Sequence, residues 1–320
     1  MTKVLIFTAF IFSSFTVKLY AQPYTVTSPD NRISVSVDVK ESTYYSVVFY
    51  GENIIRPSKI NMVIDGKELG SDAKVLKIMR HSTTNTLKPV IPRKFGEITD
   101  EYNELSIHFK GNYMLTFRVY DDGVAYRWET RMKNPVRVNS ELAAFVFAGD
   151  HKIWFPQEES MHSHQERDYK YIALSEIKED MFCSTATLID LGNGNKVLLS
   201  EAELNDYPGM FLKGFGSYGL QGKFAPYPLK TEQTNDRNVR VTEYADYLAE
   251  TTGTRTFPWR VMVLSMDDAQ LIESELIYKL SNPLALDDVS WIKPGKVAWD
   301  WWNYNNIYGV DFRAGVNTET

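Results

Sequence analysis

The sequence is poor in cysteine, because only Cys183 among its 320 residues carries a thiol. One thiol cannot form an intrachain disulfide, so stability must come from the size of the buried core, even in an oxidising compartment. Cys183 follows Met and Phe, and apolar neighbours are more typical of a small buried residue than of a nucleophile. The sequence therefore offers neither a disulfide framework nor a sign of thiol chemistry.

Basic residues are also few. The chain has 35 Lys and Arg against 41 Asp and Glu, which gives a formal charge of −6 at pH 7. An acidic protein of this kind has no basic face to hold a phosphate backbone, so nucleic acid is not an expected partner. The 43% of hydrophobic residues is ordinary for a globular protein, and the length suits two folding units.

No apolar run reaches the roughly 18 residues of a membrane span. The most apolar run near the N-terminus is Val4–Phe12, which follows Lys3, and the segment closes with Leu-Tyr-Ala at Ala21. This order is typical of a secretory signal peptide cut after Ala21, whereas a membrane anchor would need a longer uninterrupted span. We therefore expect residues 1–21 to be removed and the mature protein to be soluble in the periplasm, without membrane association.

Helical periodicity is scarce as well, and before the C-terminal segment only Asp267–Leu276 shows it. Strict alternation of apolar and polar residues is clear in Ile33–Val39. Two further alternating runs, Tyr113–Tyr120 and Val124–Thr130, flank an Asp-Asp-Gly turn and predict a hairpin. Many short alternating strands predict a large antiparallel β-sandwich. The polar, proline-interrupted stretch Ser82–Arg93 predicts a loop.

The C-terminal segment has a different character, because three of the seven tryptophans fall within four positions, 299 to 302. Pro294-Gly295 predicts a turn, and Lys296–Trp299 predicts a short buried strand. The residues that follow would lie at the carboxyl end of that strand, where an α/β barrel keeps its chemistry.

The side chains at this strand end suit a pyranose. The indoles of Trp301 and Trp302 offer flat apolar faces to a sugar ring, and Asp300 and Asn303 can hydrogen-bond to its hydroxyls. The alternative is a tryptophan cluster that packs at a domain interface with Asp300 as a cap. Composition alone leaves both interpretations open.

A second candidate site is acidic. Glu201, Glu203 and Asp206 follow the apolar strand Val197–Ser200. Carboxylate oxygens suit Ca²⁺, which takes about six to eight oxygen ligands. If the strand continues through Glu203, the side chains of Glu201 and Glu203 point the same way. A solvated acidic loop is the alternative.

The remaining clusters carry weaker signals. His162 and His164, with the glutamates around them, match no common zinc spacing, and we interpret them as part of a polar loop. The glycines between Gly214 and Gly222 lack the strand-then-helix context of a phosphate loop. The sequence has no Gly-x-Ser-x-Gly elbow to support a Ser-His-Asp triad.

Four separated motifs together resemble glycoside hydrolase family 97, namely Glu201–Met210, Arg255–Arg260, Trp291–Asn303 and Gly309–Thr318. The resemblance covers the whole mature chain. It implies an exported, calcium-dependent α-glucosidase or α-galactosidase in which a β-super-sandwich leads into a catalytic (β/α)8 barrel. The Ala-Trp-Asp-Trp-Trp-Asn form is similar to the retaining, α-galactosidase-like branch, whereas the inverting α-glucosidase branch tends to carry Gly-Ile-Trp-Trp there.

The resemblance also implies roles for single residues. Glu201 would reach the mouth of the barrel and bind Ca²⁺, while Glu203 gains no role. The nucleophilic Asp and the acid/base Glu of the retaining branch lie on later barrel strands, so no catalytic residue is expected before Thr320. Asp300 would then serve as a hydroxyl acceptor beside the two tryptophans, or as a group at the first barrel strand that supports the pocket without touching the sugar.

The expectation is a mainly β protein with a signal peptide over 1–21, a large antiparallel β-super-sandwich over 22–288, and the first strand of a truncated (β/α)8 barrel over 289–320. The parent enzyme would hydrolyse terminal α-galactosidic bonds in oligosaccharides, with Ca²⁺ as its cofactor. Two alternatives remain. One is an inverting α-glucosidase of the same family, and the other is a non-catalytic carbohydrate-binding β-sandwich.

A chain that lacks the two catalytic carboxylates should not hydrolyse glycosides, because retaining hydrolysis needs both groups about 5–5.5 Å apart across the glycosidic bond. We expect the purified 320-residue chain to release no p-nitrophenol from p-nitrophenyl α-galactoside in the presence of Ca²⁺. Turnover near that of a full-length relative would contradict the placement of the catalytic residues beyond Thr320.

Overall fold

The computed structural model describes residues 22–91 and 93–296. By packing, the chain divides into two units. The first comprises the residues up to Thr86 and Thr99–Asn282, and the second comprises Leu87–Ile98 and the residues from Pro283 onward. In the second unit, Lys88 forms an ion pair with Glu97. The predicted limits at 21, 288 and 320 are not tested and stay a prediction.

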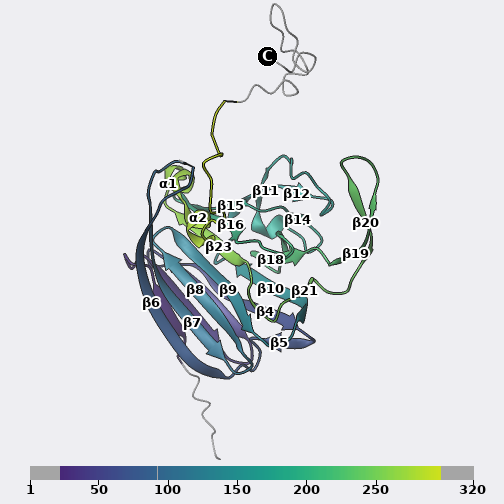
Figure 1. Ribbon diagram of the computed structural model, residues 1–320. Coiled ribbons are helices and arrows are strands. Elements are labelled where there is room, and N and C mark those ends of the chain that lie inside the picture. Colours follow the sequence, from purple (N-terminus) through teal and green to yellow (C-terminus); the bar gives the residue numbers. More distant parts are fainter. Residues whose placement is uncertain (1–21, 92, 297–320) are drawn as a thin grey trace, which may run out of the picture. The chain divides into compact units, whose positions relative to one another are not determined.

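Eleven strands of the first unit form one antiparallel sheet (Figure 1). They are β1 (Tyr24–Thr27), β2 (Ile33–Val39), β3 (Thr43–Phe49), β4 (Glu52–Ile64), β5 (Lys67–Leu69), β10 (Val136–Val146), β12 (Gln157–Glu158), β14 (Phe182–Cys183), β17 (Met210–Gly214), β18 (Gly219–Phe224) and β21 (Ala249–Thr251). Nine lie in the order β1-β2-β3-β4-β10-β18-β17-β14-β12, while β5 pairs with β4 and β21 with β10.

Ten strands form the second sheet. They are β6 (Val75–Leu87), β7 (Ile98–Phe109), β8 (Tyr113–Tyr120), β9 (Gly123–Arg131), β11 (Lys152–Phe155), β13 (Lys170–Ala173), β15 (Thr187–Gly192), β16 (Asn195–Ala202), β22 (Thr254–Thr256) and β23 (Trp259–Ser265). Nine lie in the order β13-β11-β15-β16-β23-β9-β8-β7-β6, and β22 pairs with β9.

The remaining elements are short. Strands β19 (Pro228–Gln233) and β20 (Val239–Tyr244) form a separate hairpin. A 3₁₀ turn, η1 (Leu174–Glu176), and two short helices, α1 (Asp268–Glu273) and α2 (Leu276–Leu280), complete the described residues. None of these helices is long and apolar enough to span a bilayer, a statement that holds for the described residues alone.

The two large sheets share one apolar core. In β2 the alternate residues Ile33, Val35 and Val37 are fully buried, as the alternation in the sequence predicts. Across the core, the ring of Tyr45 on β3 lies 5.8 Å from that of Phe117 on β8 and 5.4 Å from that of Tyr126 on β9, measured between centroids. Side chains from both inner faces therefore interdigitate, which confirms the predicted large antiparallel β-sandwich.

The predicted hairpin is confirmed as β8 and β9. Tyr120 lies opposite Gly123, so that Asp121 and Asp122 form a two-residue turn. The predicted helical segment is also present, as α1 with Asp267 as its N-cap, whose side chain accepts a hydrogen bond from the Gln270 N–H at 2.9 Å.

The prediction of a loop over Ser82–Arg93 is wrong in its first half, because β6 continues to Leu87. The strand lies at the edge of the second sheet, next to β7, and both of its faces are largely exposed. An edge strand of this kind needs no apolar alternation, and its run of threonines favours extended backbone. Ser82 and Thr84 also reach across to Asn103 and Glu101.

The close approach of β9 to β23 requires glycine at position 123. A Cβ built there would lie 2.4 Å from the backbone oxygen of Met262 and 2.6 Å from a methyl carbon of Leu276. We expect Gly123→Ala to lower the free energy of unfolding by about 1–3 kcal/mol, the range typical of overpacking, when measured by urea denaturation.

Gly96→Ala is the matched control, because a Cβ at Gly96 would have no atom within 4 Å. Equal stability of the two variants would contradict the packing argument at Gly123.

Candidate functional site

The acidic motif identified in the sequence lies where β16 ends against β23. In this pair of strands Glu201 is opposite Arg260, and Ala202 is opposite Trp259. The chain then leaves the sheet in a turn, residues 203 to 209, which we name the acidic turn. Glu203 and Asp206 both have left-handed backbones, with φ of 58° and 47°. The strand therefore ends before Glu203, so the condition under which Glu201 and Glu203 would point the same way is not met.

Both carboxylate oxygens of Glu201 accept hydrogen bonds from the surrounding protein. Oε2 accepts from Nη1 of Arg260 at 2.7 Å, and Oε1 accepts from the backbone N–H of Met210 at 2.9 Å. The side chain is only 11% exposed. Burial raises the pKa of the Glu201 carboxyl above its ordinary value, while Arg260 and the Met210 N–H oppose the shift. The carboxylate is thus held in one orientation.

Arg260 also binds a second carboxylate, that of Glu141 on β10. Nε and Nη2 of Arg260 each lie 2.7 Å from one oxygen of Glu141, a bidentate geometry. The hydroxyl of Tyr207 donates to Glu141 as well, at 3.0 Å. Since β10 belongs to one sheet and β23 to the other, this ion cluster joins the two layers of the sandwich.

The balance of charge in the cluster favours a cation. Two carboxylates face one guanidinium, so the ionised groups carry a net negative charge. The side chain of Glu201 is the most exposed of the three, at 11% against 1% for Arg260 and 3% for Glu141. Carboxylates that bind metals are themselves usually oriented by hydrogen bonds from further residues. Glu201 therefore fits the role of one ligand to a hard cation.

The described residues do not complete such a site. Within residues 22–91 and 93–296 no group of three or more His, Cys, Asp or Glu is arranged to hold a metal ion. Ca²⁺ needs about six to eight oxygens.

A further arginine fixes the shape of the acidic turn. Arg255 donates from Nη2 to the carbonyl of Asn205 at 2.8 Å and from Nη1 to that of Asp206 at 3.2 Å. Its guanidinium also lies over the ring of Phe257, 4.8 Å from the centroid. The two sequence motifs that begin at Glu201 and Arg255 are therefore in direct contact.

The side chain of Glu203 lies on the face of the second sheet opposite to that of Glu201. Its carboxylate, 6% exposed, lies 3.1 Å from Nη1 of Arg127 on β9. The Arg127 guanidinium in turn covers the indole of Trp259, at 4.3 Å from the ring centroid. Two acids separated by one residue thus point to different faces, and Glu203 has a local structural partner of its own.

Sequence reasoning missed Arg260, Glu141 and Tyr207 as partners of Glu201. One signal for Arg260 was available, because it is the single charged residue in the otherwise apolar run Trp-Arg-Val-Met-Val-Leu of β23. A charge in a fully buried strand needs an opposite charge nearby. Neither Glu141 nor Tyr207 carried a comparable local signal.

The other predicted site residues are placed as follows. Asp300, Trp301, Trp302 and Asn303 lie outside the described residues, so their proximity to Glu201 stays a prediction. Nε2 of His162 lies 2.6 Å from the hydroxyl of Tyr244 on β20.

Cys183 is buried, as its apolar neighbours predict. Burial raises the pKa of its thiol to about 12. The thiol therefore stays protonated at neutral pH and is not a nucleophile.

The structure defines a large antiparallel β domain with a buried ion cluster at one strand end, and comparison with known proteins gives its family. Residues 26–283 match the family described as Glycosyl-hydrolase 97 N-terminal. Because this match covers most of the chain, the chain belongs to glycoside hydrolase family 97, as its motifs predicted.

Two curated relatives are similar in sequence. The chain is 35% identical over 322 residues to a retaining alpha-galactosidase of Bacteroides thetaiotaomicron. The aligned region covers 95% of this chain and 48% of the relative. The chain is 24% identical over 255 residues to a probable retaining alpha-galactosidase of Streptomyces bingchenggensis. That alignment covers 78% of this chain and 36% of the relative. The chain thus spans about half the length of these relatives, or less.

Solved structures share the fold. A glycoside hydrolase family 97 enzyme from Pseudoalteromonas sp. strain K8, in complex with acarbose, has a TM-score of 0.76 at 22% identity and covers 88% of this chain and 41% of its own. A beta-arabinopyranosidase has a TM-score of 0.69 at 21% identity and covers 82% of this chain and 43% of its own. At these identities the likeness shows the architecture alone.

Removal of Arg260 should destabilise the sandwich strongly. Arg260→Met leaves two carboxylates at the end of the core without their cation, and breaking a buried ion pair costs about 3–5 kcal/mol. We expect a loss of free energy of unfolding on that order in urea denaturation followed by circular dichroism.

Arg137→Met is the matched control, because Arg137 also forms two bonds to one glutamate, Glu250, but at an exposed site. The control should change stability little, since exposed pairs contribute little. Similar losses in the two variants would argue against a special role for the buried cluster.

Proposed function

We propose that this chain forms the N-terminal β domain of an exported, calcium-dependent retaining α-galactosidase that removes terminal α-linked galactose from oligosaccharides. The observation that carries the proposal is the 35% identity to the Bacteroides thetaiotaomicron retaining alpha-galactosidase over 95% of this chain. The Ala-Trp-Asp-Trp-Trp-Asn sequence ending at Asn303 supports the same branch of the family.

Oligosaccharides are the substrate class that the relatives support. The Pseudoalteromonas enzyme was solved with acarbose and, as an E480Q variant, with panose. In the proposed enzyme, Trp301 and Trp302 form an apolar wall against the sugar ring, and Asp300 and Asn303 bind its hydroxyls. The signal-like sequence of residues 1–21 supports export to the periplasm as part of this proposal.

Glu201 is the residue of this domain that would hold Ca²⁺. The bound ion would supply a fixed positive charge to the sugar pocket. The protein's own part is to orient the carboxylate, and Arg260 and the Met210 N–H do so with bonds of 2.7 and 2.9 Å. Arg255 keeps the acidic turn in the shape that brings Met210 to Glu201.

The experiment uses the enzyme expressed from the reading frame extended downstream of codon 320. We expect hydrolysis of p-nitrophenyl α-galactoside with retention of anomeric configuration, little hydrolysis of the α-glucoside, and loss of activity on addition of EGTA. Glu201→Gln should raise the Ca²⁺ concentration for half-maximal activity by about tenfold or more, since even an outer partner of a metal ligand is worth 10- to 100-fold.

Glu203→Gln is the control, because it changes an acid at the same strand end that points to the other face of the sheet. The Ca²⁺ dependence of this variant should match that of the wild type. Preferred cleavage of the α-glucoside with inversion would favour the inverting α-glucosidase instead. Equal effects of the two substitutions would remove the assignment of Glu201.

A further inference from the structure

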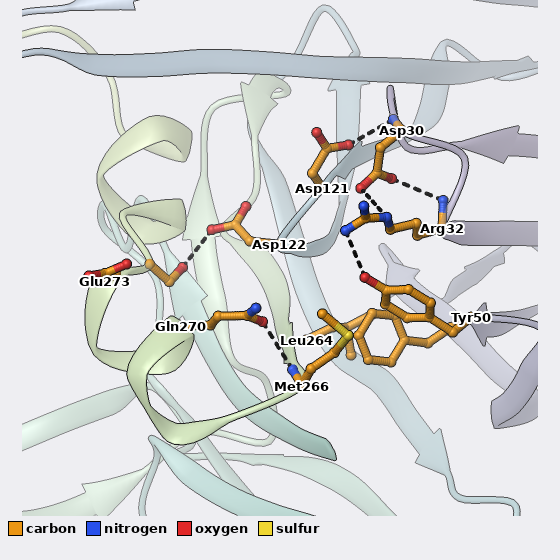
Figure 2. Close-up of a pocket in the computed structure, with 11 residues that line it drawn as sticks. Asp30, Arg32, Tyr50, Asp121, Asp122, Leu264, Met266, Gln270 and Glu273 are labelled. Carbon is orange, nitrogen blue, oxygen red and sulfur yellow. Dashed lines mark hydrogen bonds and ion pairs between the residues drawn. The ribbon is translucent and has the colours of Figure 1, made fainter. Parts of the chain in front are cut away.

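A groove in the first unit lies where strands of both sheets end. It has a volume of about 490 Å³, within the range of small-molecule sites. Asp30 and Arg32 precede β2, Tyr50 follows β3, and Asp121 and Asp122 lie between β8 and β9. The end of β23 with Leu264 and Met266, and α1 with Gln270, complete the lining (Figure 2). None of these residues belongs to the acidic turn.

The polar groups of the groove are held in place by one another. The Asp30 N–H donates to Asp121 at 2.9 Å, and Nη1 of Arg32 donates to the hydroxyl of Tyr50 at 2.7 Å. On the other side, the Ser274 hydroxyl donates to Asp122 at 2.8 Å. Figure 2 shows the side chains of Asp30, Arg32, Tyr50, Asp121 and Asp122 around the groove. The site is therefore built before any ligand arrives, which lowers the entropy cost of binding.

Tyr50 provides an aromatic wall at an unusual position. Tyr50 and Gly51 are the two central residues of the β3–β4 hairpin, both with positive φ, 50° and 82°. Turns of this type favour Asn, Asp or Gly at the first of these positions, so a bulky aromatic residue there is not explained by the turn. The ring is 43% exposed and is fixed edge-on against Phe49, with centroids 4.8 Å apart.

The charges of the groove select the class of ligand. The lining contains the carboxylates of Asp30, Asp121, Asp122 and Glu273 but one guanidinium, that of Arg32. This excess of negative charge disfavours phosphates and acidic sugars. In the described residues no three His, Cys, Asp or Glu side chains come together as a metal site would require. The lining can also bind a neutral ligand rich in hydroxyls, since carboxylates accept hydrogen bonds and guanidinium and amide groups donate them.

We propose that this groove binds a neutral hexopyranose unit, with Tyr50 against the C–H face of the ring and the surrounding acids, Arg32 and Gln270 on its hydroxyls. The choice of a sugar as the ligand rests on the proposed glycosidase function. An open groove covers only part of a small ligand, so we expect weak binding. Its role is to hold oligosaccharide on the β domain.

The test uses the 320-residue chain titrated with methyl α-galactopyranoside and, separately, methyl α-glucopyranoside, followed by saturation-transfer NMR. We expect saturable binding of at least one of the two. Tyr50→Asn should weaken binding by tenfold or more without lowering the melting temperature, because Asn is favoured at this turn position. Unchanged binding by this variant, or no saturable binding by the wild type, would overturn the proposal.

Tyr169→Asn is the matched control, since Tyr169 is 55% exposed and lies outside the groove. It should bind like the wild type. Binding that is lost in Trp301→Ala and kept in Tyr50→Asn would place the sugar elsewhere and also overturn the proposal. The glycosidase assignment fails on a different result, the absence of hydrolysis by the extended enzyme, so the two failures are distinguishable.

Discussion

The bond between Arg260 and its two carboxylates is the constraint on which the rest of this site depends. Burying a guanidinium is costly, and a well-packed apolar residue often gives equal or greater stability at such a position. Arg260 is nevertheless the second residue of an apolar strand, is 1% exposed, and is bonded to Glu141 across the core and to Glu201 beside it. We infer that Arg260 serves mainly to orient its partners, because it fixes one sheet against the other and holds the Glu201 carboxylate in place between them.

The acidic turn connects the buried bonds of Arg260 to residues nearer the surface. Met210 and Arg260 fix the two oxygens of Glu201, while Arg255 holds the turn that leads from β16 to Met210. Glu203, two residues on, is bound to Arg127 on the other face of the sheet. Ion pairs therefore fix this strand end on both faces of the sheet.

The sequence predicted those parts of the fold in which local pattern and tertiary burial agree. Strand β2 buries alternate residues, as its pattern predicts, whereas β8 and β9 place alternate apolar side chains in the core and are buried over most of their length. The loop predicted over Ser82–Arg93 was wrong at β6, because an edge strand exposed on both faces has no such pattern. The partners of Glu201 could not be found from spacing, since Arg260 is 59 residues away along the chain and Glu141 is 119 residues from Arg260.

The role of Glu201 as a calcium ligand came from the family resemblance and stays a prediction, and the charges around Glu201 are compatible with it. The cluster holds more negative than positive charge, and its most exposed member is Glu201. In the proposed enzyme, Ca²⁺ at this carboxylate would offset the surplus charge at the point where solvent already reaches it. Because an ion that binds the folded form alone stabilises that form, Ca²⁺ binding and the order of the acidic turn would be linked. The β domain would then contribute to the sugar pocket through the stability of its own ion cluster, as well as through one ligand.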